Sequence, residues 1–304
     1  MRPPVSLDSI SPQTPLVEKA VAWLAGRIAA DEDSAPDVRI TADAVALADA
    51  QPAMAAFVAL GTRLLAVAEK AATEEATAIE TRDRLALALS TWHADFQAAS
   101  EAIVRASATL LPGSPWIATA SRSSLVERAL LEAHAKGHPI KVLLSESRPM
   151  NEGLGFARAL AEAGVPSWLA VDAALPLLLP QAGAIWIGVD AVREKTFVTK
   201  AGTYALLLVA RELNVPVYAF AQRAKFLPDR CTRLTLPRRP AAEVWEDAPP
   251  QVSVVNLPFE EVPLALVRGV LTEGGFLAAR EIVDAAGSSP VAEELMLPPQ
   301  PSPA

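Results

Sequence analysis

The 304-residue chain has a single cysteine, Cys231, and only three histidines. One cysteine excludes a disulfide framework within the chain and is typical of a protein in a reducing cytoplasm. One cysteine and three scattered histidines are also too few for a usual zinc site. We therefore expect a cytoplasmic protein with no bound metal.

Positive charge and long apolar runs are scarce as well. Lysine and arginine together number 27 against 35 acidic residues, a formal net charge of −8, which argues against a surface that binds nucleic acid. The longest apolar runs, such as "WLAVDAALPLLLP", contain Asp172 and Pro176 and fall short of the roughly 20 residues that a membrane span requires. The first residues, "MRPPVSLDSISPQ", lack the apolar segment of a signal peptide. We expect a soluble protein whose partners include neither nucleic acid nor a membrane.

Three common site motifs are missing from the chain. It contains no G-x-G-x-x-G that opens a helix after a strand, no G-x-x-x-x-G-K-[ST] and no G-x-S-x-G. The stretch "EGLGFARAL" has Gly153 and Gly155 but lacks the third glycine and the downstream acidic partner of a dinucleotide site. We interpret it as the entry into a helix and expect no cofactor.

The chain does contain two regions of different pattern. Residues 1–111 are rich in alanine and predict a helical domain, with helices over 11–30 and 51–72 and a loop at "DSAPDVRI" between them. The clearest helix has apolar residues in steps of four and three, which predicts lengthwise packing on other helices. These residues are Leu85, Leu89, Trp92, Phe96, Ala99, Ile103, Ala106 and Leu110.

From residue 112 onward, short apolar runs alternate with helical stretches. "PWIATA", "IKVLLSE", "PSWLAVD", "AIWIGVD" and "VPVYAFA" recur every 20 to 30 residues. This alternation predicts an α/β fold over residues 112–284, a Rossmann-like parallel sheet with helices on both faces. A proline-rich loop follows Pro228, and residues 285–304 are predicted to form a disordered tail.

Ligands of such sheets bind beyond the carboxyl ends of the strands. After the first strand, "IATASRSSLVERAL" places hydroxyl groups and one charge at the start of a helix. This arrangement is a sound receptor for phosphate. The alternative is structural, because Ser123 or Ser124 could simply cap the helix. The candidates here are Thr119, Ser121, Arg122 and Ser123.

Three charged residues near later strand ends form a second candidate constellation. Asp190 ends the run "AIWIGVD", Lys200 lies in the loop after it, and Lys225 follows "VPVYAFA". Together they could surround a small anion and provide a proton acceptor, or each could be an ordinary solvated charge.

Polar residues at two further strand ends receive structural interpretations. Glu146 could pair with Arg148 or with a neighbouring subunit, and Asp172 is expected to cap the helix that begins at Ala173.

Six strand-end stretches, taken in order, resemble one protein family. They are "IATASRS", "ESRP", "DAA", "GVDAV", "TKAGTY" and "AKF". The family contains the α, β and δ regulatory subunits of eukaryotic translation initiation factor 2B, methylthioribose-1-phosphate isomerase and ribose-1,5-bisphosphate isomerase. The resemblance implies a helical N-terminal domain, a Rossmann-like C-terminal domain, and dimers or higher oligomers. For the isomerases it implies a sugar 1-phosphate pocket in which a proton moves between C1 and C2.

The resemblance also assigns roles to residues. It places the catalytic aspartate at Asp190, and it places Ser121 where the isomerases have a catalytic cysteine. A thiol titrates at about pH 8.5, whereas a serine hydroxyl does not exchange a proton near neutral pH unaided. Ala120 stands where the family has the adjacent histidine. Taken together, the strand-end chemistry and the resemblance give Thr119, Arg122, Ser123, Thr199, Lys200 and Lys225 as the predicted ligand-binding residues.

Three functions remain open at this point. The first is binding of a sugar phosphate or a nucleoside monophosphate without efficient catalysis, by a homodimer or higher homo-oligomer. The second is an aldose–ketose isomerase that uses Asp190 as acid and base. The third is an assembly subunit whose pocket has lost its use.

Overall fold

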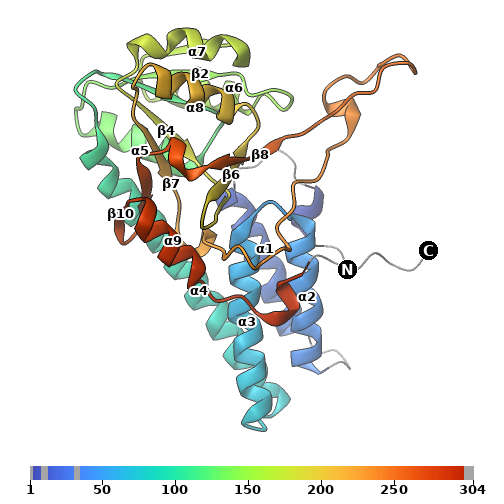
Figure 1. Cartoon of the computed structure of the whole chain (residues 1–304). Helices are drawn as coiled ribbons and strands as arrows, with labels where there is room; N and C mark the ends of the chain where they lie inside the picture. The colour runs from blue at the N-terminus through green and yellow to red at the C-terminus, as the bar shows by residue number, and fades with distance from the viewer. Residues whose placement is uncertain (1–2, 8–12, 31–34, 298–304) are drawn as a thin grey trace.

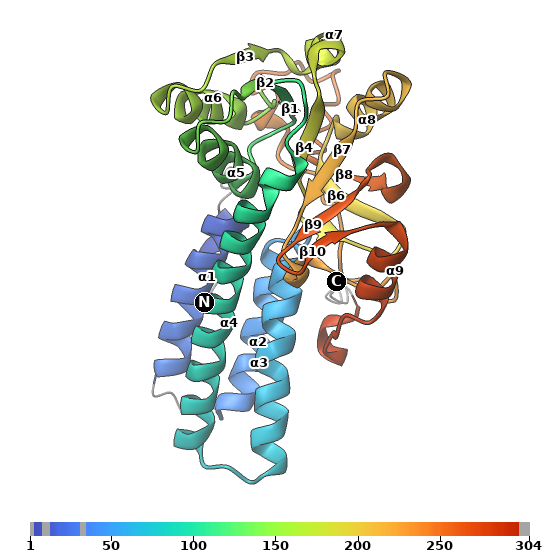
Figure 2. The same ribbon diagram turned by 90° about the vertical axis from the view of Figure 1, so that its left-hand side faces the viewer.

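The computed structural model describes residues 3–7, 13–30 and 35–297. Its N-terminal part contains a short 3-10 helix, η1 (Pro4–Leu7), and four α-helices. These are α1 (Gln13–Ala29), α2 (Pro36–Ala50), α3 (Ala55–Thr73) and α4 (Ala78–Ala106), and η2 (Ser107–Leu110) follows directly. The helices lie roughly alongside one another and form the elongated lower part of the molecule in Figure 2.

Helix α4 has the start and the packing face that its sequence predicts. Thr77 caps its first turn, and the side chain of Glu80 accepts a hydrogen bond from the Thr77 backbone N–H, the reciprocal arrangement of a capping box. Of the predicted apolar seam, Leu85, Leu89 and Phe96 are buried in the core shared with α1 and α3. Farther along, Ile103 packs in the core on one face of the sheet, so one long helix joins both parts of the fold.

The predicted loop at "DSAPDVRI" is wrong from Pro36 onward. Helix α2 begins there with proline in its first turn, a position where the missing N–H costs nothing and the fixed φ suits a helix. The helix predicted from residue 51 begins only at Ala55, because Gln51–Met54 form a turn in which the Met54 N–H donates to the Gln51 carbonyl.

The C-terminal part is built on a seven-stranded sheet in the order β10-β9-β7-β4-β1-β2-β3. The strands are β1 (Trp116–Thr119), β2 (Lys141–Ser145), β3 (Ser167–Ala170), β4 (Ala184–Gly188), β7 (Val217–Phe220), β9 (Gly269–Thr272) and β10 (Gly275–Leu277). All neighbours run parallel except the β9–β10 hairpin. Near-continuous apolar runs such as "AIWIG" are buried because parallel strands are covered on both faces. The predicted α/β sheet is confirmed.

Helices cover both faces, and the alternating side chains of each strand divide between two cores. Helices α5 (Ser124–Ala135) and α6 (Glu152–Glu162), with the end of α4, bury Ile117 and Trp186 on one face. On the opposite face, α7 (Leu175–Leu178), α8 (Thr203–Glu212) and α9 (Ala279–Gly287) bury Ala118 and Ile187. Figure 1 shows this layered part above the helices of the N-terminal region. The predicted division between residues 111 and 112 falls between η2 and β1.

A second, three-stranded antiparallel sheet corrects the prediction that Lys200 lies in a loop. Strands β5 (Ala191–Val192) and β6 (Thr196–Lys200) form a hairpin, and β6 also pairs with β8 (Phe259–Pro263). Lys200 is therefore the last residue of a strand, held opposite Phe259. The partner strand lies about 60 residues away in the chain, so no local pattern reveals this pairing.

The predicted disordered tail is wrong for residues 285–297. The chain there completes α9 and forms η8 (Glu293–Leu295), with Leu295 fully buried. The Ala292 N–H donates to Thr62 Oγ1 at 3.1 Å, and Arg233 donates to the Leu297 carbonyl. Leu295 packs in a core with residues of α2 and α3, and these hydrogen bonds add to the attachment. Figure 1 shows the backbone of this segment beside α2. Residues 298–304 lie outside the described residues.

No helix among the described residues is both long and apolar enough to span a membrane.

Candidate functional site

A cavity of about 90 Å³ lies at the carboxyl edge of the parallel sheet. Segments far apart in the chain form its wall: the turn before α3, the β1–α5 loop, the start of α6, the end of β4, β6, and the loop after β7. The lining residues include Gln51, Met54, Ala120–Ser124, Glu152, Gly188–Asp190, Thr199, Lys200 and Lys225. A second cavity of about 290 Å³ adjoins it and shares Ala120, Ser121 and Lys200.

The β1–α5 loop provides a structural cap as well as part of the cavity wall. Ser123 is the N-cap of α5, where its hydroxyl accepts from the Val126 N–H at 3.5 Å. Arg122 forms an ion pair with Glu127 at 2.6 Å, and the hydrogen bonds that the guanidinium donates to Glu127 raise the pKa of Arg122. A Cβ on Gly188 would lie 2.2 Å from Ser123 Oγ, so only glycine allows β4 to approach this loop.

Asp190 and Lys225 form the most perturbed titratable pair of the cavity. Lys225 is 5% exposed and its ammonium donates to the Val189 carbonyl at 2.8 Å. Burial lowers the pKa of Lys225 to about 8, against the opposing effect of the Asp190 charge. Burial raises the pKa of the Asp190 carboxyl, while the charges of Lys225 and Lys200 pull it down. Burial therefore shifts the two pKa values toward each other.

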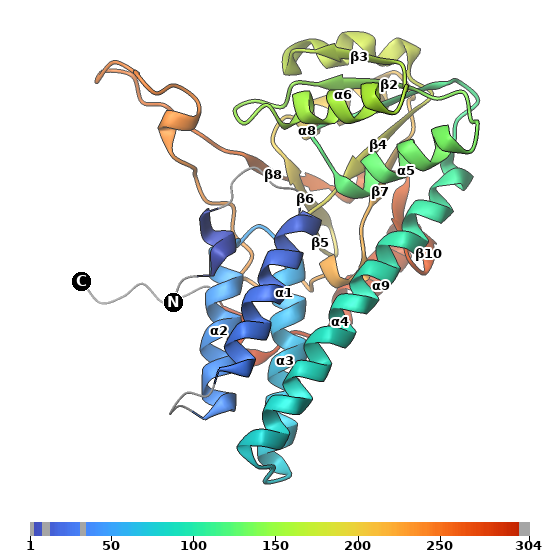
Figure 3. The same cartoon turned by 180° about the vertical axis from the view of Figure 1, so that it is seen from behind.

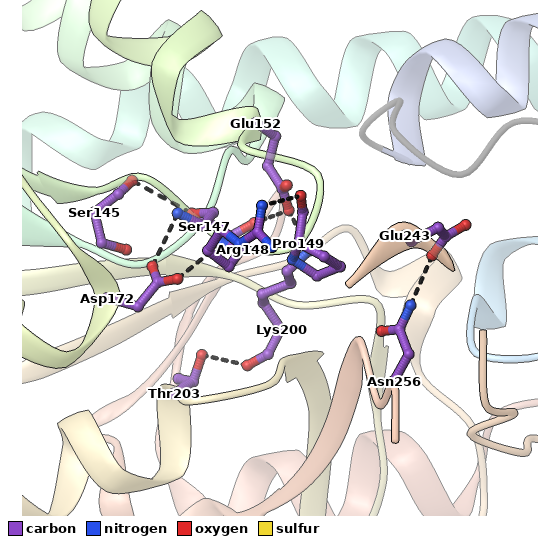
Figure 4. Close-up of polar contacts among 11 residues, drawn as sticks. Ser145, Ser147, Arg148, Pro149, Glu152, Asp172, Lys200, Thr203, Glu243 and Asn256 are labelled. Atoms are coloured by element: carbon purple, nitrogen blue, oxygen red, sulfur yellow. Dashed lines mark hydrogen bonds and ion pairs between the residues drawn. The ribbon is translucent and has the colours of Figure 1, made fainter. Parts of the chain in front are cut away.

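Lys200 reaches the same cavity from the end of β6, but it is already paired. Its ammonium forms an ion pair with Glu152, and Ser121 Oγ donates to Glu152 Oε1 at 3.2 Å. Figure 4 shows Glu152 directed toward Lys200 from the start of α6. The sequence-based interpretation missed Glu152, because "EGLGFARAL" was taken only as the entry into a helix. The residue after Glu152 must be glycine, because a Cβ on Gly153 would lie 1.8 Å from the Ser145 carbonyl oxygen.

Of two other predicted binding residues, one lines the cavity and one does not. Thr199 lines the cavity, yet its hydroxyl donates to the Gly188 carbonyl at 3.0 Å and so links β6 to β4. Thr119 is fully buried at the end of β1 and is not among the lining residues.

Asp172 does not cap the helix that follows it. Its carboxylate accepts hydrogen bonds from the backbone N–H groups of Ser147 and Arg148, at 2.8 and 2.7 Å. Ser147 has a φ of +63°, which turns two successive N–H groups toward one anion. Arg148 donates to the Val244 carbonyl at 3.0 Å rather than pairing with Glu146. These contacts fix the loop between β2 and α6, and Figure 4 shows the two hydrogen bonds to Asp172.

The proline-rich loop beyond Pro228 also contributes to the cavity wall, which the sequence did not reveal. Arg239 and Glu243 line the cavity and pair with each other at 3.0 Å, and Asn256 donates to Glu243 at 2.8 Å. Beyond them the loop extends away from the body of the molecule, as Figures 1 and 3 show.

Charge pairing is the common feature of this site. Among the described residues, each basic side chain that lines the cavity has a carboxylate neighbour. The pairs are Arg122–Glu127, Lys200–Glu152, Arg239–Glu243 and Lys225–Asp190. An anionic ligand would therefore have to compete with carboxylates that are already in place.

Comparison with known proteins places the chain in a family. Residues 20–279 match the model of the Initiation factor 2 subunit family (IF-2B). The chain is 33% identical over 171 residues to ribose 1,5-bisphosphate isomerase of Haloterrigena turkmenica, covering 51% of this chain and 52% of the relative. It is 33% identical over 154 residues to methylthioribose-1-phosphate isomerase of Gemmatimonas aurantiaca, covering 49% and 44%. The match spans about half the length of these relatives.

A solved structure agrees with this assignment over most of the fold. The translation initiation factor eIF-2B of Pyrococcus horikoshii OT3 superposes with a TM-score of 0.78 at 25% identity, over 90% of this chain and 94% of that protein. The family model, these relatives and the shared fold agree with the resemblance found in the strand-end stretches. The chain belongs to the Initiation factor 2 subunit family.

Proposed function

We propose that this protein binds a phosphorylated small molecule, either a sugar phosphate or a nucleoside monophosphate, in the cavity at the carboxyl edge of the sheet. The observation that carries the proposal is Lys225, a buried lysine that lines the cavity together with Asp190, whose charge acts on it. Burying an ammonium costs several kcal/mol and does not by itself stabilise a fold. The first turn of α5, which favours anions, lines the same cavity.

A thermal-shift experiment tests this proposal. Ribose 5-phosphate, AMP and inorganic phosphate are added at millimolar concentration, and a ligand at 100 times its Kd stabilises the folded state by about 2.7 kcal/mol. We expect at least one phosphorylated compound to raise the Tm and Lys225→Met to abolish the rise. Lys195→Met, which removes an exposed lysine between β5 and β6, is the matched control. No rise in Tm with any of the three compounds would contradict the proposal.

A second candidate function is aldose–ketose isomerisation of a sugar 1-phosphate, and the Asp190–Lys225 pair favours it. Asp190 would carry the proton between two adjacent carbons, with Lys225 as the group that titrates near neutral pH. Ser121 is an unsuitable replacement for the family's cysteine, because its hydroxyl already donates to Glu152. The test is turnover of ribose 1,5-bisphosphate or methylthioribose 1-phosphate, which Asp190→Asn should abolish. Unchanged turnover in Asp190→Asn would remove that residue from the mechanism.

We further propose that the protein acts as a homodimer or higher homo-oligomer in the cytoplasm. A structure with the same fold is named as a tetrameric eIF2B complex of β and δ subunits, and the single cysteine of this chain is buried and unpaired. Light scattering after size exclusion tests self-association. A stable partner of different sequence in pull-downs, together with no response to phosphorylated ligands, would favour an assembly subunit instead.

A further inference from the structure

We propose that Glu152 makes the Lys200 end of the cavity a subsite for a ligand hydroxyl and excludes a phosphate group from it. The ligand class is then a hydroxyl-bearing compound with one phosphate, in preference to a bisphosphate. This inference rests on the proposed function, because it specifies which phosphorylated ligand the same cavity takes.

The position of the Glu152 carboxylate is the first support. Its ion pair with Lys200 is largely withdrawn from solvent, since the two side chains are 10% and 14% exposed. Ser121 adds a hydrogen bond to the same oxygen, Oε1, at 3.2 Å. A phosphate oxygen approaching Lys200 would meet this carboxylate in a poorly solvated setting, where repulsion between like charges is strong. The positive charge of Lys200 is therefore already compensated within the protein.

The second support is the other oxygen of the same carboxylate. Glu152 Oε2 is buried and has no hydrogen-bond partner, although Glu152 lines the cavity. Buried carboxylate oxygens normally have a donor, because leaving one unsatisfied is costly. A sugar hydroxyl can donate to it, whereas a phosphate dianion has only acceptors to offer.

The rest of the cavity leaves one place for the single phosphate. Lys225 and Ser124, in the first turn of α5, also line the cavity, and a helix N-terminus favours an anion. The adjoining cavity of about 290 Å³ begins at Ser121 and Lys200, so the remainder of a ligand larger than one sugar has space beyond the subsite.

Titration calorimetry with two probes tests the inference. Ribose 5-phosphate has one phosphate and several hydroxyls, while ribulose 1,5-bisphosphate has a phosphate at each end. We expect the wild type to bind the monophosphate at least tenfold more tightly. Glu152→Gln keeps the size and the acceptor for Lys200 but removes the charge, and it should shift the ratio of the two Kd values at least tenfold toward the bisphosphate. Glu162→Gln, an exposed position at the end of the same helix, should leave the ratio unchanged.

The outcomes separate this inference from the proposed function. A wild type that prefers the bisphosphate, or a Kd ratio that Glu152→Gln leaves unchanged, overturns the role of Glu152 while ligand binding stands. If only Glu152→Gln binds the bisphosphate and the wild type binds neither probe, the exclusion by Glu152 stands and the proposed function fails. If no variant binds either probe, both are overturned. Glu152→Ala removes the same charge with different packing and gives the answer if Glu152→Gln does not fold.

Discussion

Burial of Lys225 makes the free energy of unfolding depend on pH, and the size of this effect follows from the shift in the pKa of Lys225. Its pKa falls from 10.5 to about 8 in the folded state. Between these two values the unfolded chain binds a proton that the folded chain has released, so the free energy of unfolding rises with pH. At about 1.4 kcal/mol for each pH unit, the rise from pH 8 to 10.5 amounts to about 3 kcal/mol.

Lys225→Met is the perturbation that isolates this effect. Urea unfolding of the wild type and the variant, followed by circular dichroism at pH 7, 8, 9 and 10, gives the difference in unfolding free energy at each pH. Burial also raises the pKa of the Cys231 thiol, which makes the folded state less stable as pH rises through this range. Cys231 is present in both proteins, so its contribution cancels in the difference.

We expect the wild type to gain stability over Lys225→Met steadily above pH 8, and Lys195→Met to keep the wild-type pH dependence. A difference between the wild type and Lys225→Met that stays constant from pH 7 to 10 would refute the reasoning. It would mean that the ammonium of Lys225 is solvated in the folded protein as it is in the unfolded chain.

Other predictions concern the close contacts of the site and the C-terminal segment. Gly188→Ala places a Cβ 2.2 Å from Ser123 Oγ and should weaken ligand binding more than tenfold, as calorimetry would measure; full binding would contradict that contact. Leu295→Ala removes a fully buried side chain and should lower the free energy of unfolding by about 3 kcal/mol. Leu297→Ala, at a position that is 59% exposed, is its control and should cost less than about 0.5 kcal/mol. Arg233→Met removes the hydrogen bonds to the Glu294 and Leu297 carbonyls and should speed amide hydrogen exchange in residues 293–297; unchanged exchange would contradict this role of Arg233.

The spacing of apolar residues predicted a helix correctly where that helix buries one regular face. The three- and four-residue spacing from Leu85 to Ile103 predicted α4, because a helix repeats every 3.6 residues and its core face must be apolar. It failed at Pro36, where alanine and charged residues surround a proline that begins a helix rather than interrupting a loop. It failed again at Leu295, because one apolar residue that anchors a segment has no periodic neighbours.

By itself, the sequence determined that five strands alternate with helices from residue 112 onward and that they form a parallel sheet. This placed Ser121 and Asp190 near the carboxyl ends of strands, and the structure shows that those strands are neighbours and that both residues line one cavity. Tertiary structure alone decided which charges meet there. The pairing of β6 with β8 and the approach of α6 bring Lys200 to Glu152, 48 positions apart by number. Local sequence encodes backbone conformation and burial, whereas the partner of a charged side chain depends on how distant segments pack, which no local pattern specifies.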